Sequence, residues 1–106
     1  MELQKIQKLL MSYPKFSDFK KLEVKLLKKN KKDEYWGTSV KRFVRMTDET
    51  NGITETYKVE GVIYLNLKDI SDTGKLLQVV AEEAAHLLDD GPGLIAEIYN
   101  YLKEEA

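Results

Sequence analysis

Two stretches rich in β-branched and aromatic residues, 35–46 and 53–67, lie on either side of the turn-forming segment 47–52. That segment ends in Asn51-Gly52, a dipeptide that favours the tight turns of β-hairpins. The sequence therefore predicts a hairpin of two long strands, and the other elements have to be arranged around it.

The second strand of this hairpin carries apolar side chains on both faces, because Val62 and Tyr64 alternate with Ile63 and Leu65. We expect it to be the best-buried strand of the sheet. A further strand is predicted at residues 19–27, where apolar and charged residues alternate. The sheet is thus expected to contain three or four strands and to be mostly antiparallel.

Three segments show the apolar spacing of amphipathic helices. Residues 2–11 form the first, which Pro14 brings to an end. Residues 75–88 form the second, and a third starts near Leu94, after a break at Gly91-Pro92-Gly93, and runs to the C-terminus. The predicted fold class is α+β, with an N-terminal helix, a sheet, a motif helix and a C-terminal helix.

The length of 106 residues is that of one ordinary domain, so residues 1–106 are expected to share one core. No run approaches the roughly 18 apolar residues that span a bilayer, and the first ten residues lack a signal peptide's uninterrupted apolar region. We therefore expect a cytoplasmic protein without a membrane segment. Because the chain has no cysteine, any metal has to be bound by His, Asp and Glu.

The formal net charge is only −1, but the charges are unevenly distributed along the chain. Up to Arg45 there are 13 Lys and Arg against 5 Asp and Glu, and beyond it 4 against 13. The run Lys-Lys-Asn-Lys-Lys at residues 28–32 is followed directly by Asp33 and Glu34, which is more typical of a solvated turn than of a nucleic-acid contact. The pattern favours a protein partner over nucleic acid.

The only histidine, His86, stands in the run Glu82-Glu83-Ala84-Ala85-His86 of the motif helix. At about 100° per residue, Glu82 and His86 are neighbours on the side of the helix that faces away from its apolar stripe. Two ligands spaced in this way can hold a divalent ion, and Glu83 then points beside it. In a zinc hydrolase such a carboxylate takes a proton from the metal-bound water.

A catalytic zinc site uses three protein ligands and a water, so a third ligand is needed beside Glu82 and His86. The acidic candidates that follow His86 are Asp89, Asp90 and Glu97. We favour Glu97, because packing of the last helix against the motif helix can bring its carboxylate to the other two. Asp89 is the closer alternative, on the same face of the motif helix.

The run Val62-Ile63-Tyr64-Leu65-Asn66, followed by Val-Ala-Glu-Glu-Ala-Ala-His-Leu-Leu at residues 80–88, resembles the ImmA/IrrE family of small metallopeptidases. In that family a strand of the type I-Y-L-N precedes a helix with H-E-x-x-H, and variants reading A-E-E-x-x-H also occur. The resemblance covers residues 61–99. It implies a minimal zincin-like fold, Zn²⁺ as cofactor, His86 and Glu82 as zinc ligands and Glu83 as general base.

The resemblance also implies a small metal-dependent peptidase that acts on a protein substrate, such as a regulator in a phage, mobile-element or toxin system. Two other functions remain open from the residues. A non-catalytic domain of the same fold can serve as a protein-interaction module, which the replacement of the first motif histidine by Glu82 favours. An unrelated α+β adaptor can contact an acidic partner through its basic N-terminal half.

Each motif residue also has a purely structural interpretation. Glu82 and His86 can form a solvated pair on the outer face of the helix. Glu83 can be an ordinary surface carboxylate, and Glu97 a favourable acid in the first turn of the last helix. The sequence does not indicate the substrate or the oligomeric state.

Overall fold

A computed structural model of the chain describes residues 3–26, 37–50, 52–66, 73–89 and 92–105. The elements follow in the order α1 (Leu3–Ser12), η1 (Pro14–Phe16), β1 (Phe19–Leu26), β2 (Gly37–Asp48), β3 (Thr54–Leu65), α2 (Thr73–Leu87) and α3 (Pro92–Glu105). This order confirms the predicted α+β class, and the bounds of the elements lie close to the predicted ones.

The sheet has three strands in the order β1-β3-β2, so β3 occupies the centre. The hairpin strands β2 and β3 are antiparallel, in a register that runs from Gly37 opposite Leu65 to Asp48 opposite Thr54. The first strand instead pairs with β3 in parallel, from Phe19 opposite Val59 onwards. The sheet is therefore mixed, because β1 lies beside the more apolar β3 and not beside β2, its neighbour in sequence.

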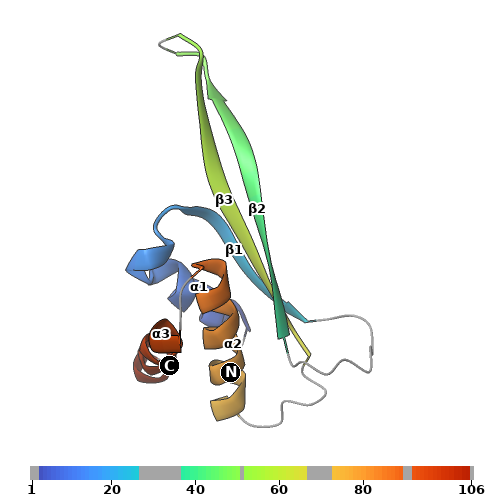
Figure 1. Cartoon of the computed structure of the whole chain (residues 1–106), viewed down its shortest axis with the longest axis vertical. Coiled ribbons are helices and arrows are strands. Elements are labelled where there is room, and N and C mark those ends of the chain that lie inside the picture. The colour runs from blue at the N-terminus through green and yellow to red at the C-terminus, as the bar shows by residue number, and fades with distance from the viewer. Residues whose placement is uncertain (1–2, 27–36, 51, 67–72, 90–91, 106) are drawn as a thin grey trace.

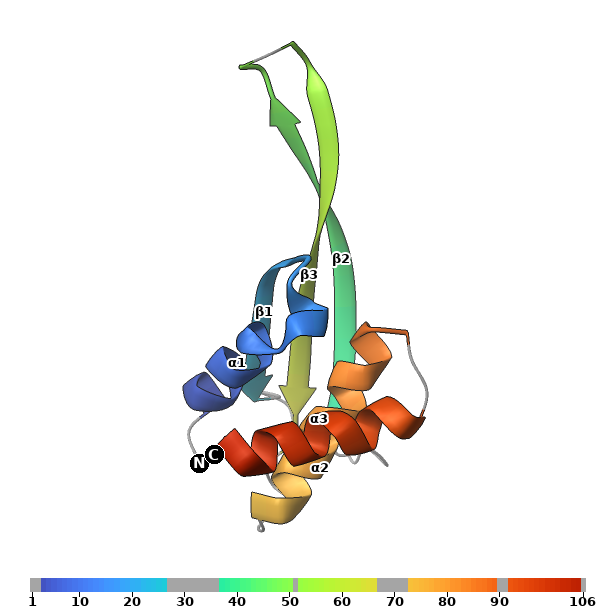
Figure 2. The same ribbon diagram turned by 90° about the vertical axis from the view of Figure 1, so that its left-hand side faces the viewer.

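The helices α1, α2 and α3 all lie on one side of this sheet, as Figures 1 and 2 show. There α1 packs against β1, α2 packs against β2 and β3, and α3 packs against α2. On that face Ile63 and Leu65 of β3 are fully buried, whereas Val62 and Tyr64 on the other face are only half-buried. The second face of β3 stays partly exposed, because no helix of the described residues covers it. The largest fully buried side chains of the core are Phe16, Ile6, Leu10, Leu22, Ile63, Leu65, Ile98, Leu102 and Val80.

The helices lie close against the sheet at Gly61 of β3. A Cβ atom at this position would lie 3.0 Å from Cδ1 of Leu22 and 3.0 Å from Cδ1 of Leu87. Both distances are shorter than ordinary van der Waals contacts, so glycine allows α2 and β1 to pack together here. This close packing sets the position of the C-terminal end of α2, which carries the histidine.

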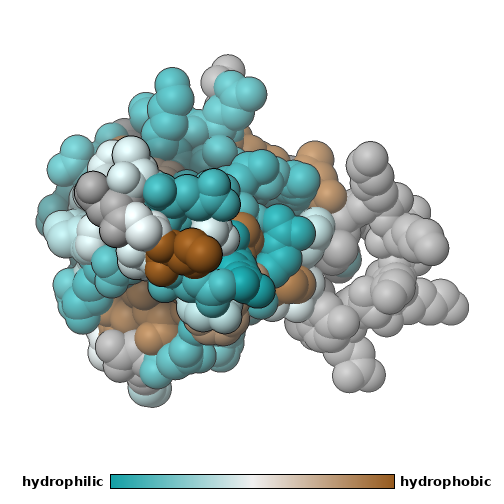
Figure 3. All heavy atoms as spheres, turned by 90° about the horizontal axis from the view of Figure 1, so that it is seen from above, coloured by the Kyte–Doolittle hydropathy of each residue, from teal (hydrophilic) through white to brown (hydrophobic). Residues whose placement is uncertain are grey.

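The hairpin extends well beyond the helices and gives the molecule dimensions of 52 × 31 × 25 Å. Register pairs with β1 end at Val59, so residues 44–48 and 54–58, the arm, form a two-stranded ribbon. Near or on the arm, Phe43, Ile53 and Tyr57 are 66%, 81% and 65% exposed. Seen from the hairpin end, hydrophilic side chains cover most of the surface, with hydrophobic ones in separate areas (Figure 3). No helix in the described ranges is long and apolar enough to cross a membrane.

Candidate functional site: the seam between α2 and β2

The motif helix lies against the start of the edge strand β2, and glycine makes this contact possible. A Cβ atom on Gly37 would stand 2.8 Å from Cγ1 of Val79 and 3.3 Å from Cγ of Glu83. On the helix, Ala84 and Ala85 are buried, and their small side chains leave room for close packing. We call this line of contact, with Gly37, Lys41, Glu83, His86 and Asp89, the α2–β2 seam.

Glu83 is the buried member of the seam, with 9% of its surface exposed. Loss of hydration raises the pKa of its carboxyl group, and the neighbouring charge of Glu82 adds to this rise, whereas His86 lowers it. The interpretation of Glu83 as an ordinary surface carboxylate is therefore wrong. A carboxyl group whose pKa is raised by burial can hold a proton closer to neutral pH, which suits a proton carrier.

His86 lies beside Glu83, one helical turn further along, and is exposed to solvent. Its Nε2 atom is 4.0 Å from Oε1 of Glu83, and 67% of its side chain is exposed. Glu82 is half-buried on the same helix. The structure thus brings Glu83 and His86 together. The carboxylate that pairs with His86 is that of Glu83, the predicted base, and not that of Glu82, the predicted ligand.

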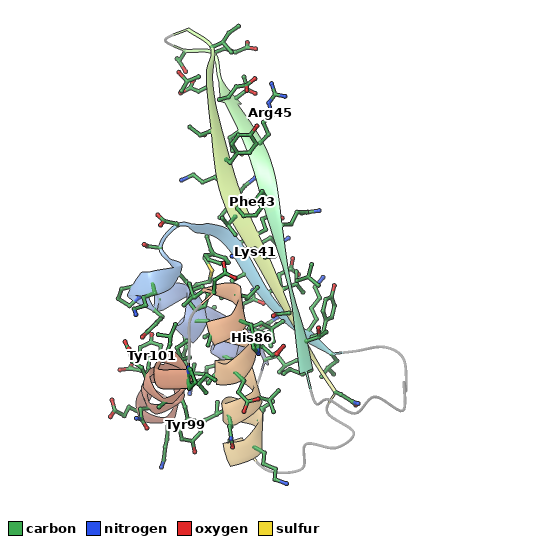
Figure 4. The ribbon with its side chains drawn as sticks, in the orientation of Figure 1. Lys41, Phe43, Arg45, His86, Tyr99 and Tyr101 are labelled. Atoms are coloured by element: carbon green, nitrogen blue, oxygen red, sulfur yellow. The ribbon has the colours of Figure 1, made fainter. Side chains whose placement is uncertain are left out.

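Lys41 links β2 to the end of the motif helix by donating to Oδ2 of Asp89, as an ion pair. Asp89 has a positive φ of 54°, and its backbone N–H bonds to the carbonyl oxygen of His86. Asp89 thus forms the turn that ends α2. Its carboxylate is paired with the amino group of Lys41. Figure 4 shows Lys41, Phe43 and Arg45 following one another along β2, from the helices into the arm.

Glu97 lies on α3, away from the seam, with its carboxylate engaged elsewhere. The hydroxyl of Tyr13 donates a hydrogen bond to Oε1 of Glu97. Burial and the Glu97 carboxylate raise the pKa of Tyr13 to about 12. The carboxylate therefore ties α3 to the turn after α1, and the structure does not bring it to Glu82 and His86.

The predicted zinc site can be tested against this geometry. Among the described residues, no group of three or more His, Asp and Glu side chains is placed to hold a metal ion. Glu82 and His86 supply two candidate donors on one helix, and a catalytic zinc site requires a third. Asp90, one of the predicted alternatives, lies outside the described residues. The described residues therefore do not fit a three-ligand zinc centre.

Comparison with family models, curated proteins and solved structures finds no match for this chain. Its likeness to the ImmA/IrrE peptidases thus stays a prediction that rests on the residues of β3 and α2.

The structure also shows a feature that the sequence motifs do not indicate, namely the open outer edge of β2. In the described part of the chain, β2 is an edge strand of 12 residues that pairs only with β3. The opposite edge is partly closed, because the backbone N–H of Val24 in β1 donates to the side chain of Gln7 on α1. The periodicity of a hairpin predicts two paired strands but not which of them is an edge strand of the sheet. No local signal in the sequence therefore identifies this edge.

Proposed function

We propose that this chain is a protein-interaction module that binds an extended polypeptide segment along the outer edge of β2. The observation that carries the proposal is the difference between the two sheet edges, since α1 caps the edge of β1 at Val24 and the described residues leave β2 uncapped. An open strand edge offers a row of backbone donors and acceptors, which an incoming strand can pair with.

The basic side chains of β2 give this edge its specificity. A strand added to β2 runs past Lys41 on one side of the sheet and past Arg42 on the other, because successive side chains point to opposite faces. Before Asp48, β2 carries Lys41, Arg42 and Arg45 and no carboxylate. An incoming strand with acidic side chains at matching positions is therefore favoured, while the cations oppose pairing of β2 with a second β2.

Zinc-dependent peptide hydrolysis is the second candidate, and Glu83 favours it. Its buried carboxyl lies beside His86 at the seam, next to the edge where an extended substrate would lie. The resemblance to ImmA/IrrE peptidases gives the same residue the role of base. This candidate needs a third metal ligand, which the described residues do not supply. Both candidate functions are compatible with the cytoplasmic location that the sequence predicts.

Metal content and hydrolysis separate the two candidates. Protein purified without chelator is analysed for zinc alongside His86→Ala and Glu83→Gln, and each is incubated with casein as a general substrate. The interaction module predicts less than one zinc per chain in all three proteins and no cleavage. One zinc per chain, lost in His86→Ala, with cleavage lost in Glu83→Gln, would establish the peptidase instead.

The edge itself is tested with proline variants, which serve as controls for each other. Of two consecutive residues in an edge strand, one directs its N–H outward, and proline is tolerated only there. We therefore compare Thr38→Pro with Ser39→Pro and keep the variant that unfolds closer to the wild type. Displayed peptides of about 12 residues, selected on the wild-type protein, should bind this variant at least about tenfold more weakly, because one proline removes an edge donor. Unchanged affinity would refute edge binding.

A further inference from the structure

The face of the sheet that the helices leave open contains a hollow that is distinct from the backbone edge of β2. It has a volume of about 280 Å³, and its polar lining comes from all three strands. Lys21, Glu23 and Lys25 belong to β1, Glu60 to β3 and Arg42 to β2. The apolar floor is formed by Val40, Val62 and Tyr64.

The cations of this hollow are much more exposed than its carboxylates. The side chains of Lys21, Lys25 and Arg42 are 59%, 53% and 72% exposed, against 21% for Glu23 and 14% for Glu60. Glu23 lies 2.9 Å from the amino groups of both lysines, and Glu60 pairs with Arg42. These contacts lower the pKa of both carboxyl groups. Both carboxylates therefore remain ionised and paired with the cations. An incoming ligand therefore meets the cations first.

Two further lysines extend the positive charge toward the arm. Lys58 lies opposite Val44 in the β2–β3 register, so it points to the same face as Arg42. The amino group of Lys20 reaches Sδ of Met46, at 3.7 Å, which is two residues beyond Val44. In the described part of the open face between Tyr64 and Met46 there are thus five cations and two carboxylates that are already paired.

We propose that this open face binds an acidic polypeptide segment whose carboxylates are separated by neutral residues. Charge complementarity carries the proposal, and the spacing of the charges selects the class of partner. Lys21 and Lys25 lie on one side of β1 with Glu23 between them. A polypeptide can place a neutral side chain opposite Glu23, whereas a nucleic-acid backbone bears a phosphate on every unit and would meet Glu23 and Glu60.

The partner is an extended segment and not a compact surface, because the cations follow the strands. They extend along the face from Lys25 toward Lys20 and Lys58, over a sheet that twists. An extended acidic segment can follow this line with carboxylates on alternate residues, which lie on one side of the chain. The hollow then accepts one of its side chains over Val62 and Tyr64.

The test uses a fluorescent peptide of about 12 residues in which Glu and Thr alternate, so that its charges follow the strand period. Its binding to the whole chain is measured by anisotropy at low and high salt. The Lys20→Gln, Lys25→Gln, Lys58→Gln variant leaves the Lys21–Glu23 and Arg42–Glu60 pairs in place. The matched control replaces the exposed Lys5, Lys8 and Lys15, on α1 and η1, by Gln and changes the net charge equally.

We expect the open-face variant to bind the peptide at least about tenfold more weakly and the control variant to bind like the wild type. Amide shifts of Val62 and Tyr64 on adding the peptide to the wild-type protein locate the contact without relying on a variant. The retained proline variant of the β2 edge should still show the amide shifts of Val62 and Tyr64 when this peptide is added, which separates the open face from the edge.

Several results would overturn the proposal. Equal weakening in both lysine variants would show that only net charge matters. Tighter binding of a single-stranded oligothymidylate, weakened by the same open-face variant, would assign the face to nucleic acid. Dimers of the wild-type protein that the open-face variant abolishes would assign it to a second copy of the chain. Absent amide shifts at Val62 and Tyr64 would place the peptide elsewhere.

Discussion

Ile63 and Val62 are neighbours in β3, yet they belong to two very different surfaces. Ile63 is fully buried beneath the helices, and Val62 lines the hollow of the open face. The same strand therefore has one face that holds the fold together and one that is free to meet a partner. The covered face is closely packed around glycine and alanine, whereas charged pairs dominate the open face.

The largest expected difference between the two faces is in stability. Ile63→Ala removes side-chain atoms from the closed core and should lower the free energy of unfolding by about 2–5 kcal/mol. Val62→Ala, one residue away on the open face, should cost about 1 kcal/mol or less, because its side chain is only half-buried. Urea unfolding of both variants measures the difference. Equal losses would show that the open face is covered in solution.

The seam offers the next largest effect, through Gly37. In Gly37→Ala the new methyl group would meet Val79 and Glu83, so the variant should lose about 1–3 kcal/mol of unfolding free energy. Thr38→Ala is the control, since its side chain points to the open face, opposite Tyr64. Thermal unfolding compares the two variants. A Gly37→Ala protein as stable as the control would mean that α2 does not pack tightly against β2.

A smaller effect is expected from the hydrogen bond that Glu97 accepts from Tyr13. Tyr13→Phe removes this bond at the rim of the covered side and should cost about 1 kcal/mol. Glu97→Gln should lower the pKa of Tyr13 from about 12, because the carboxylate contributes to raising it. Absorbance titration of tyrosine at alkaline pH reports this change. An unaltered titration would show that Glu97 does not accept a hydrogen bond from Tyr13 in solution, so that its carboxylate is available for another role.

The smallest effect is a dependence of stability on pH that Glu83 causes. Burial raises its pKa above the ordinary 4.5, so the native state binds the proton more tightly than the unfolded chain. Stability from this group is thus fully present below the ordinary value and is lost as the pH rises through the raised pKa.

Glu83→Gln removes this dependence, so the variant should gain stability relative to the wild type as the pH rises from about 4 to about 8. Denaturant unfolding at several pH values, with Glu82→Gln as the control, measures the difference. Parallel curves for the wild type and Glu83→Gln would show that the carboxyl is hydrated in solution, and would remove the main support for a proton-carrying role.

Much of the secondary structure was predictable, because it depends on local patterns. Apolar spacing located the helices, Pro14 the end of α1, and the polar residues after Met46 the connection between the two hairpin strands. The pairing of β1 was not predictable in the same way. It depends on which strand occupies the centre of the sheet, and the alternation in β1 fits a parallel or an antiparallel neighbour equally well.

In the candidate site, too, the properties that depend on one helix were predictable and those that depend on packing between elements were not. Helical periodicity correctly predicted that His86 is exposed, because that depends on one helix only. It did not predict the burial of Glu83, which arises from the contact of α2 with Gly37. The proposed ligand Glu97 depended on how α3 packs, and its hydrogen bond to Tyr13 could not be read from residues that lie far apart in sequence.

By itself, the sequence determined the elements of this protein, their order and the motif Glu82-Glu83-Ala84-Ala85-His86. These follow from interactions between residues close together in the chain, which periodicity and turn chemistry record. Only the tertiary structure decided which face of β3 is covered, which sheet edge is open and where the charges of the basic half gather. Those properties arise when segments distant in sequence exclude water from one another, and no local pattern contains that information.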